Sequence, residues 1–462
     1  MSEANGGMRR AAIAASIGGL FAAGAFLHIP FFNGPEYWPW RWLRRDDALT
    51  IAVCFALAAA PALLALRVRH RIGAVALVAL SVVAMQVTAL SCAGLPPLAR
   101  LTVIVTDPAS TSYGNAAMQV VDWQQRSTSA WVPKFDQFLT YFPMHARTKP
   151  LMPVAFYVAL LRLFGASTPL AAAVAVAALS VVAVIAVHAA VRGLAGDDAA
   201  LLAAVLVALM PAPAIFFPQL DVVYPLFSAC VLATWPRALN GSIGAAAAFG
   251  VTVFAMSLAS YSLLVLGAFC VVLAAIETWR ARSLRRAAVA AGTALAVIVI
   301  AYAIFDAATG YPALAVFRAA LRQQRMIVPF LHRPYPLTVP FDLLDFALGI
   351  GWTPVIAAIF FAARRTPSPA RGVAIAGLFV PVVVALSGLL QAETARVWIF
   401  LMPFVALAAA LEMTYWSRAA RLLLFGSMIV VTIAVYLNMR FTYERVFSGS
   451  MVFRAVPLHA IR

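Results

Sequence analysis

The residues best suited to chemistry lie in a polar and aromatic stretch between Thr106 and Pro150. Asp107 directly follows an apolar run, so its carboxylate is expected at the exposed end of a helix, where it is our candidate general base. A carboxylate before proline is also a common helix cap or turn residue, and both roles are open. Tyr113 and Asp136 belong to the same stretch and are further site candidates.

Five basic side chains near this stretch and near later turns are candidates for binding an anion: His145, Arg147, Lys149, Arg333 and Arg396. Arginine suits a phosphate group because its planar guanidinium makes two parallel, charge-assisted hydrogen bonds. Other roles are open for each of them. Glu393 and Arg396 are spaced for an ion pair one helical turn apart, and His145 could cap a helix.

Two acidic residues complete the set of candidates. Asp221 precedes an apolar run, where it could cap a helix or line a site, and Glu393 precedes another. The sequence has no cluster with metal-ligand spacing, so we predict no metal site, although a divalent cation shared by a carboxylate and a phosphate stays an open alternative. It also has no P-loop and no dinucleotide-binding fingerprint.

Membrane-spanning helices must position these residues. Hydrophobic residues make up 64% of the 462-residue chain and charged residues only 11%, whereas about a quarter of an ordinary soluble domain is charged. The apolar residues form blocks of about 17–24, the length that a helix needs to cross a bilayer. We therefore predict one all-α domain over residues 1–462, a polytopic transmembrane bundle of about 12–14 spans.

The candidate spans lie at roughly 11–27, 49–66, 73–92, 168–191, 199–216, 222–236, 241–258, 261–278, 287–305, 347–363, 371–390, 396–413 and 420–437. Five arginine clusters in short connections should face the cytoplasm, at residues 9–10, 67–71, 280–286, 364–365 and 418–421. All five clusters lie on the same side of the membrane only if the short stretch 150–164 does not cross it.

This topology leaves long extracytoplasmic segments. The first large loop is 94–149, the second is 306–346, and a tail follows at 438–462. We expect amphipathic juxtamembrane helices in these loops and an interfacial aromatic belt at residues 37–42. The net charge of +17 comes from arginines scattered through the connections, which favours topology signals over nucleic-acid binding.

The order of these motifs resembles the membrane glycosyltransferases of the GT-C fold, such as protein mannosyltransferases, aminoarabinose transferases and rhizobial lipopolysaccharide transferases. The resemblance rests on Asp107 with Tyr113 after it, on His145-Ala146-Arg147-Thr148-Lys149-Pro150, and on Pro218-Gln219-Leu220-Asp221. It continues through Arg333-Pro334-Tyr335, residues 342–349 and Glu393-Thr394-Ala395-Arg396. Lys149 stands where the family often has histidine, and Leu151 where it often has a second proline.

The resemblance implies a bacterial inner-membrane enzyme with its active site on the extracytoplasmic face. It would transfer a hexose or pentose from a polyprenyl-phosphate donor to a glycan, lipid or protein acceptor of the cell envelope. The alternative is a multi-span transporter or flippase of a lipid-linked or small polar substrate. Transporters often carry ionisable residues near the bilayer midplane and two related halves, and neither is evident in the sequence. A polymerase or ligase of lipid-linked sugars would usually gather its basic residues in one late loop.

Overall fold

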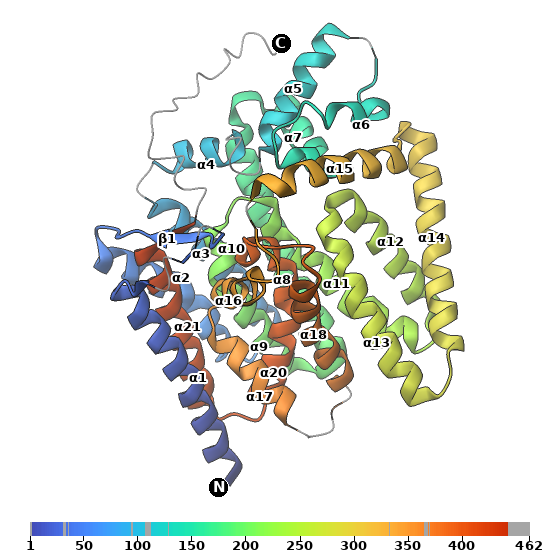
Figure 1. Cartoon of the computed structure of the whole chain (residues 1–462). Coiled ribbons are helices and arrows are strands. Elements are labelled where there is room, and N and C mark those ends of the chain that lie inside the picture. Colours follow the sequence, from blue (N-terminus) through green and yellow to red (C-terminus); the bar gives the residue numbers. More distant parts are fainter. Residues whose placement is uncertain are drawn as a thin grey trace.

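The computed structural model of the whole chain describes residues 2–30, 34–35, 37–93, 96–106, 112–127, 129–331, 333–364, 368 and 370–441. Asp107 and the part of the predicted tail after residue 441 lie outside these ranges. The described part is a bundle of helices with one small pair of strands (Figure 1). The predicted all-α, polytopic fold is confirmed.

Seven helical segments of the described part are long and apolar enough to cross a membrane. Their bounds are Ala48–Ala65 (α2), Arg71–Ser91 (α3), Leu151–Ala195 (α7 and α8), Leu220–Leu239 (α11 and the 3-10 turn before it), Tyr261–Ala281 (α13 and the 3-10 turn before it), Arg285–Thr309 (α14) and Arg418–Asn438 (α21). Two further helices, Thr338–Ile350 (α16) and Thr353–Ala363 (α17), meet at a bend of 108° and make an eighth span if they count as one.

The bundle also contains shorter helices and one long N-terminal helix: Ser2–Phe26 (α1), Asp197–Leu209 (α9), Pro211–Ile215 (α10), Ile243–Ala259 (α12), Arg371–Ser387 (α18), Thr394–Val397 (α19) and Met402–Met413 (α20). Several predicted spans are therefore broken. The run 199–216 divides at Met210 because Pro211 cannot donate a backbone hydrogen bond. The run 347–363 bends at Gly351, whose φ of 92° interrupts the helix.

One end of the bundle holds the helices of the two predicted large loops, and we call it the site end. These helices are Pro97–Thr106 (α4), Tyr113–Arg126 (α5), Phe135–Phe138 (α6) and Ala313–Ile327 (α15). Figure 1 shows them gathered there, with Leu151–Phe164 (α7) beside α5. On α15, Val316 and Ala319 are buried while Arg318 and Arg322 are exposed, as expected of an amphipathic helix.

The two strands join distant parts of the chain. Trp40–Trp42 (β1) pairs antiparallel with Met439–Phe441 (β2). Trp38 and Trp40 are 3% and 1% exposed, so the predicted interfacial belt is wrong for these two rings. The indole of Trp40 donates a hydrogen bond of 2.6 Å to the Asp345 carboxylate of α16, so this strand contributes to the interior of the bundle.

The arginine clusters gather at the other end. Arg10 of α1 and Arg364 after α17 both bind the fully buried Glu412 of α20, at 2.6 and 2.8 Å. Arg421 of α21 makes a second ion pair at this end, with Asp198 of α9 at 2.8 Å. Clusters that the sequence predicts on one side of the membrane are therefore neighbours in the structure.

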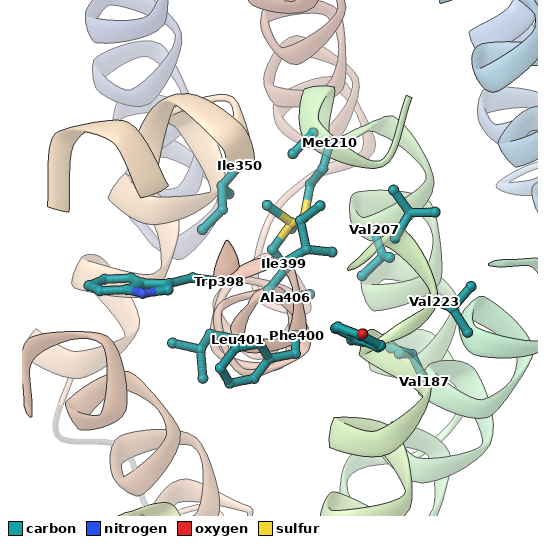
Figure 2. Close-up of a cluster of buried hydrophobic side chains, with 14 of the residues drawn as sticks. Val187, Val207, Met210, Val223, Ile350, Trp398, Ile399, Phe400, Leu401 and Ala406 are labelled. Carbon is teal, nitrogen blue, oxygen red and sulfur yellow. The ribbon is translucent and has the colours of Figure 1, made fainter. Parts of the chain in front are cut away.

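The interior of the bundle is packed around the segment that leads into α20. Trp398, Ile399, Phe400 and Leu401 are completely buried. Figure 2 shows them among side chains of α8, α9 and α16, including Val187, Val207 and Ile350. This packing fixes the chain directly after Arg396.

Candidate functional site

Three charged residues from two turns form the centre of the site. Glu393 directly precedes α19, Arg396 lies within it, and their side chains are ion-paired. Arg333, which precedes α16, lies 3.7 Å from the other oxygen of Glu393 and donates a hydrogen bond of 2.7 Å to the Gln391 carbonyl. Arg396 is only 5% exposed, while a quarter of the Arg333 side chain is exposed. The predicted ion pair and the predicted pair of arginines thus belong to one arrangement.

The turn after α10 brings a third segment to this centre. Arg396 donates a hydrogen bond of 3.4 Å from Nη1 to the side-chain oxygen of Gln219. Asp221 follows in the 3-10 turn Leu220–Val223, and it is 9% exposed. The helix that follows, Pro225–Leu239 (α11), has Tyr224 at its N-cap, so Asp221 does not occupy the helix-cap position considered for it.

A fourth segment carries Lys149 and His145. They flank the 3-10 turn Ala146–Thr148 that leads into α7. The Lys149 ammonium donates a hydrogen bond of 3.2 Å to the Ser260 hydroxyl, which lies 2.7 Å from that of Ser262 at the end of α12. The His145 side chain makes no cap bond to the 3-10 turn, so the cap role is not realised there.

Charged groups on the four segments are close enough to shift one another's pKa values. Burial and the nearby positive charge of Arg396 lower the pKa of His145 from 6.5 to about 4, so this imidazole is neutral at pH 7. Burial also lowers the pKa of Lys149, an effect that the nearby Asp221 carboxylate opposes. Burial alone would raise the pKa of Glu393, but the guanidinium groups of Arg396 and Arg333 hold it below its ordinary value.

Tyrosine side chains line the site beside Asp221. Tyr113, the first residue of α5, is 2% exposed, and its ring centroid is 6.3 Å from that of Tyr157 on α7. Burial and the Asp221 carboxylate raise the pKa of the Tyr113 phenol well above its ordinary value. Tyr224 is also buried, and its hydroxyl donates a hydrogen bond of 3.4 Å to the Ala259 carbonyl, next to Ser260. The Tyr113 phenol therefore keeps its proton and can donate a hydrogen bond.

Two candidates are not joined to this site, and a third lies outside the described residues. Arg147 points its guanidinium at the Phe142 carbonyl of its own segment. Asp136 lies half-buried on α6, and no hydrogen bond or ion pair of its side chain is found in the described part of the chain. Asp107 lies outside the described residues, so its role as general base stays a prediction.

The sequence interpretation missed several residues of the site. Gln219 and Ser260 contact Arg396 and Lys149 directly, and Tyr157 lies next to Tyr113. Gln219 was identifiable, because it lies two residues before Asp221 in a motif already noted. Ser260 lies in the short connection between two predicted spans, and Tyr157 lies in the apolar stretch 150–164; neither residue type signals a site by itself.

The charges of the site suit an anion. Three cations (Lys149, Arg333 and Arg396) face two carboxyl groups (Asp221 and Glu393), beside a neutral histidine. This balance fits a singly charged phosphodiester, whose oxygens accept from guanidinium and ammonium groups. Within the described ranges, no group of three or more His, Cys, Asp or Glu side chains could hold a metal ion.

No family model matches this chain, and no curated protein matches it either.

Proposed function

We propose that this protein is a membrane glycosyltransferase that moves a sugar from a polyprenyl-phosphate donor to an extracytoplasmic glycan, lipid or protein acceptor. The observation that carries the proposal is the meeting of Lys149, Arg333 and Arg396 at the site end. Together they carry one more positive charge than Glu393 and Asp221 balance, which favours a further anion in the site. The resemblance to the GT-C glycosyltransferases supports the same reading.

An apolar cavity supports a lipid-linked substrate. A cavity of about 650 Å³ lies among α11, α12, α13 and α14, with Trp235, Phe249 and Leu295 in its lining. Met256 and Leu264, which also line it, lie on either side of the Ser260–Ser262 turn that binds Lys149. A lipid could place its phosphate at Lys149 and its chain in this cavity, so that its charged group meets the charged site and its apolar chain meets the apolar lining.

The transfer would use these residues as follows. The acceptor hydroxyl oxygen attacks the anomeric carbon of the sugar, and the bond from that carbon to the phosphate oxygen breaks. Asp107 is the proposed base that takes the hydroxyl proton. Arg333, Arg396 and Lys149 stabilise the charge that gathers on the departing polyprenyl phosphate.

A transporter is the second candidate, because the bend between α16 and α17 resembles the broken helices of transporters. The Asp345 carboxylate of α16 argues against this role. Asp345 accepts hydrogen bonds on both oxygens, from Trp40 and from the Ala395 backbone. It is therefore occupied within the protein rather than open to a transported ion.

Binding of undecaprenyl phosphate to the detergent-solubilised protein tests the proposal. Arg396→Gln should weaken binding by roughly 10–150-fold, because a lost charge-assisted hydrogen bond costs about 1.5–3 kcal/mol. Arg364→Gln is the matched control, since it removes a half-buried arginine paired with the buried Glu412 at the other end. Equal affinity of the wild type and Arg396→Gln, or an equal loss in both variants, would contradict the proposed phosphate site.

A further inference from the structure

The turn that presents Glu393 and Arg396 has an unfavourable backbone conformation. Ala392 and Glu393 have φ values of 58° and 55°. This left-handed region is disfavoured for residues with a side chain, because Cβ then crowds the following carbonyl. Two such residues in succession persist only where surrounding contacts hold them.

Two carboxylates of α16 supply those contacts. One oxygen of Asp342 accepts the Ala392 N–H at 2.6 Å, and one oxygen of Asp345 accepts the Ala395 N–H at 3.0 Å. The Thr394 hydroxyl lies between them, 2.5 Å from the Asp342 carbonyl and 3.2 Å from Asp345. Both aspartates and Thr394 are at most 2% exposed.

The support extends beyond α16. The other oxygen of Asp345 accepts from the Trp40 indole at 2.6 Å, which connects β1 to the turn. On the other side, Arg333 donates to the Gln391 carbonyl at 2.7 Å. Asp345 therefore accepts from Trp40, Thr394 and Ala395 at once, and all three bonds are made within the protein.

We propose that Asp345, with Asp342 and Thr394, is a positioning residue that holds the turn 391–396 so that Arg396 meets the donor phosphate. This inference rests on the proposed function, and it assigns no contact with substrate to either aspartate. A phosphate site requires its guanidinium within a fraction of an ångström of the productive place, so a loosened turn lowers affinity although Arg396 is intact.

Asp345→Asn tests the proposal sharply. Both carboxylate oxygens accept from N–H groups, so an amide must point its own N–H₂ at either Trp40 or Ala395. Undecaprenyl phosphate binding should weaken about tenfold or more, and exchange of the backbone amides at 392–396 should become faster. Glu412→Gln is the matched control, because it disturbs an equally buried carboxylate at the other end without contacting the turn.

If Asp345→Asn does not fold, two substitutions of Thr394 test the same turn with a smaller change of the buried contacts. Thr394→Val keeps the shape but removes the hydroxyl, whereas Thr394→Ser keeps the hydroxyl. Binding should weaken severalfold in the first and stay near the wild-type value in the second. Equal behaviour of the two variants would overturn the inference.

A double-variant cycle separates positioning from general loss of stability. If Asp345 acts through Arg396, Asp345→Asn should cost almost nothing further in the Arg396→Gln background. Fully additive losses would contradict the positioning role. Normal binding by Asp345→Asn, while Arg396→Gln loses affinity, would overturn the inference alone. Failure of the wild type to bind undecaprenyl phosphate would instead contradict the proposed function.

Discussion

His145 shows how the surroundings of one residue decide its charge. Its pKa of about 4 makes it neutral at pH 7, so it contributes a hydrogen-bonding ring and no positive charge. In the unfolded chain the ring takes a proton near pH 6.5, and in the folded protein only near pH 4. Between these values the unfolded state binds more protons, so stability falls as the pH falls.

His145→Gln should remove this part of the pH dependence. The part of the free energy of unfolding that depends on His145 is fully present above about pH 6.5 and declines towards pH 4. The decline is on the order of 3 kcal/mol in total. Thermal unfolding of both proteins in detergent between pH 7.5 and 4.5 measures it, because other titrating groups cancel in the difference. Parallel curves for the two proteins would show that His145 is not held neutral.

Asp107 carries the catalytic prediction, although it lies outside the described residues. Asp107→Asn keeps the shape and hydrogen-bonding capacity but removes the proton acceptor. A general base contributes about 10²–10⁴-fold, so turnover should fall by that factor while undecaprenyl phosphate still binds. Asparagine caps helices about as well as aspartate, so near-normal turnover would identify Asp107 as a cap. Asp136 would then be the next candidate base.

At the scale of elements, the close approach of α16 and α19 brings the site together. A methyl group added at Gly349 would lie 2.9 Å from the Ala395 Cα, so Gly349→Ala must push the two helices apart. We expect a loss of about 1–3 kcal/mol in stability together with weaker binding of undecaprenyl phosphate.

The matched control for Gly349→Ala lies on the lipid-facing helix α14. A methyl group at Gly292 meets no atom within 4 Å, so Gly292→Ala should be neutral or slightly stabilising. Thermal unfolding and binding of both variants are compared. Gly349→Ala with wild-type stability and binding would show that the contact can relax without consequence.

The helical bundle and the charged site residues could be predicted from the sequence, whereas the contacts that shape the turn could not. Apolar blocks predicted the bundle, because a span needs about 20 apolar residues whatever its partners. Arg333, Glu393 and Arg396 were identifiable as charges beside apolar runs on the predicted extracytoplasmic side. The left-handed turn at Ala392 and the bonds of Asp345 were not predictable, because they depend on contacts between residues about 50 positions apart. Trp40 was misread for the same reason, since its partner lies 305 positions away.

At the scale of the molecule, the grouping of arginine clusters predicts the topology. Reporters fused after Arg71, Arg286 and Arg365 should report the cytoplasm, and reporters near residues 125 and 325 the opposite side. Reporters fused at the polar ends of α14 and α18, outside the apolar parts of these helices, serve as controls that the fusion proteins insert into the membrane. A cytoplasmic signal at residue 325 would mean that the segment 150–164 crosses the membrane, and that the orientation predicted for the later spans is wrong.

The central claim is that the site end breaks the bond between a sugar and a polyprenyl phosphate. The most direct measurement places the wild type and Arg396→Gln in liposomes containing polyprenyl-phosphate-linked sugars and extracted cell-envelope acceptors, and follows free polyprenyl phosphate by mass spectrometry. We predict acceptor-dependent release by the wild type and at least tenfold slower release by Arg396→Gln. Movement of the intact donor across the bilayer without any release would contradict the account and identify a transporter.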